Sequence, residues 1–334
     1  MADHLDTETS VSVDLTETGI TANAKSRFVA AVDRLGGNLL ELANAPLERR
    51  IAKQRAISAG EVKLIEAVTA YGIEKLQHDP EFARRAVGQY FDRVFQKQVN
   101  KDQVLLEALE NLRHDPPSEA ASTGGKTELG EEFLNRFEQY AEGASTEQLR
   151  QKWGRVLSAE VRAPGTFSVK VLRTVDEIDA ETAKSFEDVC ELSFANLIPK
   201  CLSGKLEFGR QTQLAMAGLL IDPGIAGHIA QYGDGKDSQG NELWLFRAAD
   251  RAVSFPKGTP VPPNDPNAMG PVIDADDRPS IPVYLLTDVG AAIAQIFSRQ
   301  SAFPRHVAKL RDSLAGVSVR EYTAASDGSL VAVA

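Results

Sequence analysis

A helical pattern that breaks at residues 163–165 constrains this fold more than any other stretch of the sequence. Before the break, apolar residues recur at the spacing of one helix face, and Trp153 stands among them. A buried Trp153 would contribute the most apolar area, so we expect it at the centre of a core. Pro164 lacks a backbone N–H and disfavours helix at the preceding residue, and Gly165 tolerates a positive φ. The helix must therefore end here, and the chain can turn.

Capping residues define the helices on both sides of this break. Ser145, with Gln148 three residues later, predicts a capping box at the start of the tryptophan helix. After the break, Ser168 is a plausible cap for a short helix, and Asp179 for a longer one. Three short helices joined by tight turns can bury a shared apolar centre. We therefore expect a central helical domain over residues 128–203.

The N-terminal third carries longer helical patterns. We expect a tail at residues 1–20, because it is acidic and holds little apolar surface to bury. Residues 21–114 predict long helices in a hairpin or a coiled coil, with a break near 78–80. Their apolar stripes exceed what one short hairpin needs, which indicates self-association. The first stripe suits a helix packed on its neighbour or on a second subunit, or else an interfacial membrane helix, and it consists of Phe28, Val32, Leu35, Leu39 and Leu42.

A polar segment separates these helices from the central ones. Residues 115–127 begin with Asp-Pro-Pro and hold almost no apolar residue, which predicts a linker. Residues 124–127 read Gly-Gly-Lys-Thr and imitate the end of a phosphate-binding loop. They lack the upstream glycine and the preceding apolar strand that such a loop requires. We therefore expect no nucleotide site here.

The C-terminal residues 204–334 combine helical and strand patterns. A short helix near 209–217 precedes an apolar strand, and two further strands are expected at 243–246 and 281–286, separated by polar and proline-rich loops. A later helix opens at Thr287 or Asp288. This order resembles the winged-helix arrangement, so the expected fold class is mainly α with a C-terminal winged-helix-like α+β module. Such modules bind DNA or protein, and the candidate base-reading residues are Arg210, Gln211 and Gln213.

Composition limits the classes of function. The chain has 334 residues, 43% of them hydrophobic, and a formal net charge of −10, so attraction to nucleic acid or anionic lipid is not its default. The two cysteines, Cys190 and Cys201, favour a reducing compartment over a disulfide scaffold. The N-terminus does not read as a secretory signal, and no apolar run is long enough to span a membrane. We expect a cytoplasmic protein.

Residues that could support catalysis or bind metal form no recognisable motif. The five histidines are scattered, and we expect neither a metal site nor a cofactor. Asp274, Asp276 and Asp277 could clasp a cation, but a solvated acidic loop is the simpler interpretation. Glu160 is the one carboxylate that stands out, and an ion pair with a neighbouring arginine is its simpler role. The sequence thus favours a non-enzymatic protein.

One run of residues resembles a known family. Leu149, Trp153, Gly154, Leu157, Glu160, Pro164, Gly165, Phe167 and Ser168 follow the signature of a bacterial family catalogued as domain of unknown function 2806. The likeness covers roughly residues 40–320 and is most specific between 130 and 200. The related abortive-infection alpha family has a similar helix, followed by one that Asp179, Ala180, Ala183 and Phe186 echo. The resemblance implies an intracellular bacterial protein and a connection to defence against phage, and it supplies no catalytic residues.

These patterns together predict a non-enzymatic interaction protein that self-associates and binds a protein partner. Trp153, Glu160, Pro164, Gly165 and Ser168 are the candidate structural or interaction residues. A DNA-binding regulator and a membrane-perturbing effector acting through residues 21–44 remain the two alternatives.

Overall fold

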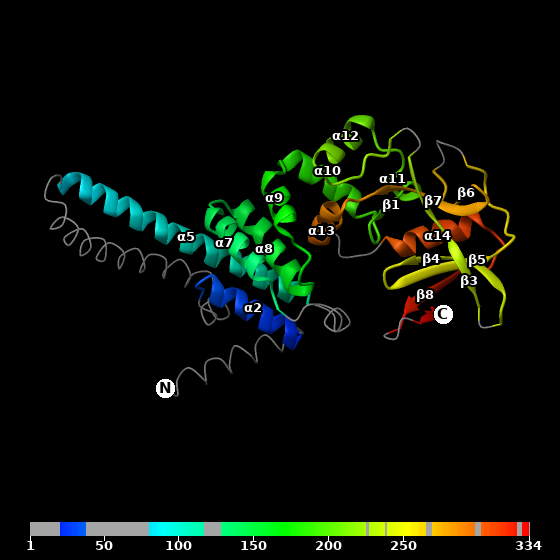
Figure 1. Cartoon of the computed structure of the whole chain (residues 1–334), viewed down its shortest axis with the longest axis horizontal. Coiled ribbons are helices and arrows are strands. Elements are labelled where there is room, and N and C mark those ends of the chain that lie inside the picture. Colours follow the sequence, from blue (N-terminus) through cyan, green and yellow to red (C-terminus); the bar gives the residue numbers. More distant parts are fainter. Residues whose placement is uncertain are drawn as a thin grey trace. The chain divides into compact units, whose positions relative to one another are not determined.

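The computed structural model describes residues 21–37, 80–116, 128–224, 227–237, 239–264, 269–297, 302–325 and 329–333. The chain divides into two compact units, Met1–Leu172 and Arg173–Ala334, whose elements appear in Figure 1. Several predictions lie outside the described residues: the tail, the part of the 21–114 helical prediction that covers residues 38–79, the Gly-Gly-Lys-Thr run and most of the linker. The predicted domain limits stay predictions.

The first unit is built from helices. The longest of its described helices, α5, places its C-terminal half along α7 and α8 (Figure 1). The apolar stripe of this half is buried by helices of the same chain, so it gives no support to self-association. The described helices of this unit are α2 (Ala22–Arg34), α5 (Pro80–His114), α7 (Glu131–Gly143) and α8 (Glu147–Arg162), and α9 (Val169–Glu177) crosses the boundary between the units. The buried stripe is Val104, Leu105, Ala108, Leu109 and Leu112.

Helix α2 packs inside this unit. Phe28, Val32 and Leu35 are buried, and the guanidinium of Arg27 donates a hydrogen bond of 3.0 Å to the carbonyl of Val161 in α8. The described part of the first apolar stripe thus packs on neighbouring helices of its own chain. An interfacial membrane helix would need the same side chains at the surface.

Helix α8 begins one residue later than the predicted capping box. Thr146 is the N-cap, and its hydroxyl accepts a hydrogen bond of 3.3 Å from the backbone N–H of Leu149. Ser145 instead belongs to the exit turn of α7, where its N–H donates to the carbonyl of Gly143. The helix ends at Arg162, at the predicted break. Gly165 has φ +91°, the left-handed backbone that favours glycine there.

The second unit contains two antiparallel sheets besides its helices. One sheet has the order β1-β7-β2, with β6 also pairing β7, and the other has the order β3-β4-β5-β8-β9. The helices are α10 (Ala180–Cys190), α11 (Lys200–Ser203), α12 (Phe208–Met216), α13 (Asp288–Phe297) and α14 (Phe303–Ser313). The strands are β1 (Leu197–Pro199), β2 (His228–Gln231), β3 (Gly233–Lys236), β4 (Glu242–Ala248), β5 (Arg251–Pro256), β6 (Ile273–Ala275), β7 (Arg278–Leu285), β8 (Arg320–Ala324) and β9 (Leu330–Ala332).

These sheets overturn the predicted fold class. The protein is α+β, and the mainly α prediction with a winged-helix-like module is wrong, because sheets of four and five strands exceed one small wing. Several strands were not predicted from the sequence, because they are short and carry glycine or charged residues, as Gly233–Lys236 does. They form because more apolar strands offer them paired edges: β4 pairs with β3, and β7 pairs with β2 and β6. The predicted loops between strands therefore contain further strands.

The acidic run at 274–277 is part of a hairpin. Asp276 and Asp277 are the two turn residues between β6 and β7, and their φ angles are +54° and +59°. A two-residue hairpin turn with both φ positive matches the twist of its strands, and aspartate tolerates it. Asp274 lies in β6 itself. The turn thus places Asp276 and Asp277, and strand pairing places Asp274, whose Oδ1 is buried with no hydrogen-bond partner among the described residues.

Helix α13 begins against the segment that follows α12. The hydroxyl of Thr287 accepts a hydrogen bond of 2.9 Å from the N–H of Gly290, as expected of a cap. The same hydroxyl donates to the carbonyl of Gly218, and the N–H of Thr287 donates to that of Leu219. A Cβ at Gly290 would lie 2.0 Å from the Leu219 carbonyl oxygen. Only glycine allows this close approach.

Candidate functional site

Glu160 closes the bend that follows α8. Its side chain is 1% exposed, and its two carboxylate oxygens accept hydrogen bonds from the backbone N–H groups of Gly165 (2.6 Å) and Phe167 (2.9 Å). A buried carboxylate that accepts two backbone bonds holds a turn strongly. Pro164 ends the helix, and Glu160 fixes the path that the chain takes afterwards. The Ser168 hydroxyl then accepts a bond of 3.4 Å from the N–H of Val171 at the start of α9.

Trp153 and Gly154 place α8 against its neighbours. Trp153 is 2% exposed, and its ring stacks on Tyr140 at 4.6 Å and meets Phe137 edge-on at 6.0 Å. Gly154 faces α5 so closely that a Cβ would lie 2.5 Å from the Cβ of Glu107. The large side chain of Trp153 thus packs against α7, and the missing side chain of Gly154 lets α8 cross α5 closely. This geometry gives the Trp-Gly pair a structural role.

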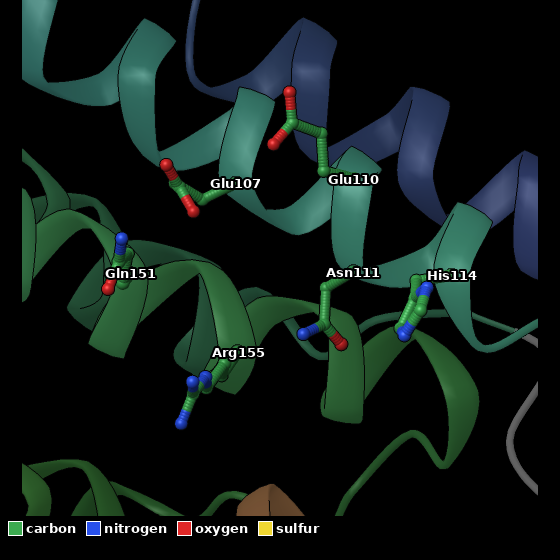
Figure 2. Close-up of a pocket in the computed structure, with 6 residues that line it drawn as sticks. All are labelled: Glu107, Glu110, Asn111, His114, Gln151 and Arg155. Atoms are coloured by element: carbon green, nitrogen blue, oxygen red, sulfur yellow. The ribbon is translucent and has the colours of Figure 1, made fainter.

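A polar pocket of about 270 Å³ lies between α5 and α8 (Figure 2). Burial, together with the nearby carboxylates of Glu110 and Glu147, raises the pKa of Glu107, and Arg155 opposes this shift. Figure 2 draws the side chains of α5 and α8 that line the pocket. Its lining residues are Glu107, Glu110, Asn111, His114, Gln151 and Arg155. The sequence did not indicate this pocket, because its residues come together only where α5 and α8 cross.

The candidate base-reading residues of α12 make hydrogen bonds within the second unit. Arg210 donates from Nε to the hydroxyl of Ser185 (2.9 Å) and from Nη2 to the Ser185 carbonyl (2.6 Å). Gln213 donates to the hydroxyl of Thr182 (2.9 Å), and Gln211 to the Leu206 carbonyl (2.6 Å). Arg210 and Gln213 thus hold α12 on α10, with which it packs in Figure 1. Their donors are directed into the fold, whereas base edges would lie outside it.

The opposite face of α12 is apolar and solvent-exposed. Phe208 is 81% exposed and Met216 is 84% exposed, and Thr212 lies between them at the same helix spacing. We call Phe208, Thr212 and Met216 the outer stripe. Single exposed apolar residues are common, but two large ones on one helix face are a candidate contact surface. The sequence could not show it, because which face of α12 is covered depends on α10.

A cysteine and a histidine far apart in sequence meet in the second unit. The Sγ of Cys201 and the Nδ1 of His306 lie 3.4 Å apart, although 105 positions separate them. Burial raises the pKa of the Cys201 thiol to about 11 and lowers the pKa of His306 to about 4. Both shifts favour the neutral forms, whereas a nucleophilic pair needs a thiolate beside an imidazolium. The pair therefore suits packing better than catalysis.

The described residues offer neither a metal-binding cluster nor a membrane-crossing helix. No group of three or more His, Cys, Asp or Glu side chains within the described ranges is arranged to hold a metal ion. Among the helices that the structure describes, none combines the length and the apolar character that crossing a membrane requires.

Comparison with known proteins gives one match. Residues 88–213 match the model of a family described as Protein of unknown function (DUF2806). This match supports the resemblance to that family. It covers part of the stretch over which the sequence indicated the likeness, and it includes the bend, the Trp-Gly pair and most of α12. No curated protein and no solved structure matches the chain.

Proposed function

We propose that this chain is a non-enzymatic interaction protein that self-associates and uses the outer stripe of α12 as its contact surface. The observation that carries the proposal is the exposure of Phe208 and Met216, at 81% and 84%, on a helix whose other face is tied to α10. Aromatic residues and methionine are enriched in the buried centres of protein interfaces. A rigidly held helix presents them without a large ordering cost.

The uses of the polar candidate residues support a non-enzymatic role. Glu160 holds the bend after α8 by accepting two backbone hydrogen bonds. Arg210 fixes α12 on α10, and Cys201 pairs with His306 in neutral form. Each group serves the fold at its position, where a catalytic group would face a substrate.

We further propose that the protein acts inside the bacterial cell in abortive-infection-type defence against phage. The support is the resemblance of the α8 run to the abortive-infection alpha family, together with the Asp179, Ala180, Ala183 and Phe186 pattern. This step is an analogy between families, and it depends on a shared partner or trigger. The outer stripe is the surface through which such a partner would act.

The two alternatives have less support. A DNA-binding regulator would need cations on an outward face, but Arg210 is directed towards Ser185, and the net charge is −10. A membrane effector would use the stripe of α2, in which Phe28 and Val32 are buried. The regulator and the membrane effector would both require side chains that are already hydrogen-bonded or buried within the fold.

The test combines sedimentation velocity with phage plaque counts in the source bacterium. We compare the wild type with a Phe208→Asp, Met216→Asp double variant, and with Val331→Asp, which places the same charge at a residue exposed by 53%. We expect the wild type and Val331→Asp to self-associate and to reduce plaques, and the double variant to do neither. A wild type that stays monomeric at every concentration and gives no protection would refute the proposal.

A gel-shift titration in steps of salt separates the DNA alternative. Phosphate contacts make duplex binding fall steeply as salt rises. Apolar self-association of a chain with net charge −10 should instead strengthen, because salt screens the repulsion between copies. Tight, salt-sensitive binding of duplex DNA would favour the regulator.

A further inference from the structure

We propose that α12 pairs with α12 of a second copy, antiparallel, across a two-fold axis at Thr212. This inference rests on the proposed self-association and specifies its geometry. It would place Phe208 of each copy against Met216 of the other. The pattern of α12, the charges at its ends and the area that it can bury support this pairing.

The outward half of α12 is uncharged. Each step of four residues turns about 40° around a helix axis, so Phe208, Thr212 and Met216 form a stripe about 80° wide. Gly209 and Ala215 flank this stripe on its two sides, and both are small. A solvated helix face normally carries charged residues. No desolvated charge would therefore oppose the approach of a second helix on this face.

The stripe is complementary to itself. Thr212 is midway between Phe208 and Met216, so reversing the helix direction about Thr212 exchanges the two large side chains. Such an isologous contact uses the same patch on both copies and closes as a dimer. A methionine sulfur beside an aromatic ring is a favourable contact, formed here twice. Gly209 would face Ala215 of the second copy, which lets the two backbones approach.

Charges beside the helix ends favour the antiparallel direction. Lys205 precedes α12, Asp222 follows it, and both are exposed. Antiparallel pairing sets the end of each helix that Lys205 and Glu207 precede against the end of the other that Asp222 follows. A parallel pair would instead set Glu207 beside Glu207 and align the helix dipoles. Opposite charges at both ends thus support one direction of pairing.

The area implies a reversible dimer. Two phenylalanines and two methionines, each more than four-fifths exposed, would bury roughly 600 Å² in total. Stable interfaces usually bury about 1,200–2,000 Å². The stripe alone therefore fits a weak, reversible dimer. A lipid surface fits less well, because the apolar face is one nine-residue helix on a chain of net charge −10.

Disulfide trapping tests the two-fold axis directly. In helices about 9–10 Å apart, facing Cα atoms on radii near 2.3 Å lie about 4.4–5.4 Å from each other, which a disulfide can span. Thr212→Cys should give a cross-linked dimer on mild oxidation of the full-length protein. A mixture of Phe208→Cys and Met216→Cys proteins should give mixed dimers in excess of either like pair. Thr323→Cys, at an exposed threonine of β8, is the matched control and should stay monomeric, as should the wild type.

Sedimentation of charged variants provides the second measurement. Thr212→Asp would set two like charges face to face on the axis, and Phe208→Asp would remove the apolar anchor. Each should weaken the dimer at least about tenfold, whereas Val331→Asp should not. Far-UV circular dichroism checks that each variant folds.

The outcomes separate this geometry from the proposed function. A wild-type dimer that persists unchanged in Phe208→Asp, or a Thr212→Cys protein that cross-links no more than Thr323→Cys, would overturn the pairing and leave self-association standing. A monomeric wild type overturns both. Flotation with phosphatidylcholine–phosphatidylglycerol vesicles that depends on Phe208 would assign the stripe to a membrane and overturn the pairing.

Discussion

Replacing Gly154 by alanine should destabilise the first unit. The added Cβ would lie 2.5 Å from the Cβ of Glu107, 3.0 Å from the backbone N of Ala108 and 3.1 Å from the carbonyl carbon of Glu107. Carbon atoms in van der Waals contact are normally about 3.5–4.0 Å apart. Two of the three obstructing atoms belong to the backbone of α5, so no side-chain rotation relieves them. The helices α5 and α8 would have to separate by about 1 Å.

Two opposing terms set the size of this effect. Alanine in a helix interior is favoured over glycine by about 0.8–1.0 kcal/mol. Overpacking a well-filled core costs about 1–3 kcal/mol, and the upper part of this range applies because Leu105, Ala108 and Leu109 of α5 are fully or nearly fully buried. The difference is a net loss of about 1–2 kcal/mol. Gly154→Leu should cost more, because its side chain would also have to enter the same crossing.

Urea unfolding followed by tryptophan fluorescence measures the loss. The two tryptophans lie in different units, so a Trp244→Phe background leaves Trp153 as the reporter of the first unit. The matched control is Gly88→Ala in α5, where an added Cβ meets nothing within 4 Å. It should leave stability unchanged or raise it slightly. If Gly154→Ala were as stable as Gly88→Ala, the close crossing of α5 and α8 would be refuted.

Three further changes have defined outcomes. Glu160→Gln keeps one acceptor but turns an amide N–H₂ towards a backbone N–H, so urea unfolding should show a loss of about 1.5–3 kcal/mol; an unchanged midpoint would contradict the bend geometry. Asp277→Gly relieves a non-glycine residue at φ +59° and should raise the melting temperature by an amount equivalent to about 0.5–1 kcal/mol, whereas a lower melting temperature would argue against the hairpin turn. Burial lowers the pKa of His306 to about 4, so the unfolded chain binds a proton near pH 6.5 that the folded chain does not; stability should fall by up to about 3 kcal/mol as the pH drops from about 6.5 to 4. His306→Gln should flatten this dependence in urea titrations, and equal slopes would contradict it.

The features that local chemistry determines could be read from the sequence. Pro164 and Gly165 predicted the end of α8, and Gly165 adopts φ +91°. Asp179 predicted the start of α10, where its carboxylate accepts a bond of 2.8 Å from the N–H of Thr182. Hydrogen bonds from the backbone N–H and the hydroxyl of Thr182 lower the pKa of Asp179. The end of α8 and the start of α10 each depend on residues within a few positions of one another, so both could be predicted without tertiary information.

Features that depend on distant neighbours could not be read. Strands such as β3 have little β-forming character of their own, and they exist because an apolar strand pairs with them. Thr146, and not Ser145, is the N-cap of α8, because Ser145 still belongs to the turn that follows α7. The pocket between α5 and α8 and the Cys201–His306 pair arise from contacts across long sequence separations. The sequence pattern of one segment does not predict contacts with distant segments.

Helix α12 buries Leu214 in the usual way, but its other residues depart from the usual distribution of polar and apolar side chains. Its cation and an amide, Arg210 and Gln213, point towards α10, whereas Phe208 and Met216 face outward. A monomer would gain stability from the opposite arrangement, because outward charged groups stay hydrated and inward apolar groups are removed from water. The observed arrangement becomes favourable once the outward face is also covered. The reversed polarity is therefore an argument for an occupant of the outer stripe that is independent of the geometry of pairing, and the double variant at Phe208 and Met216 tests it in any case.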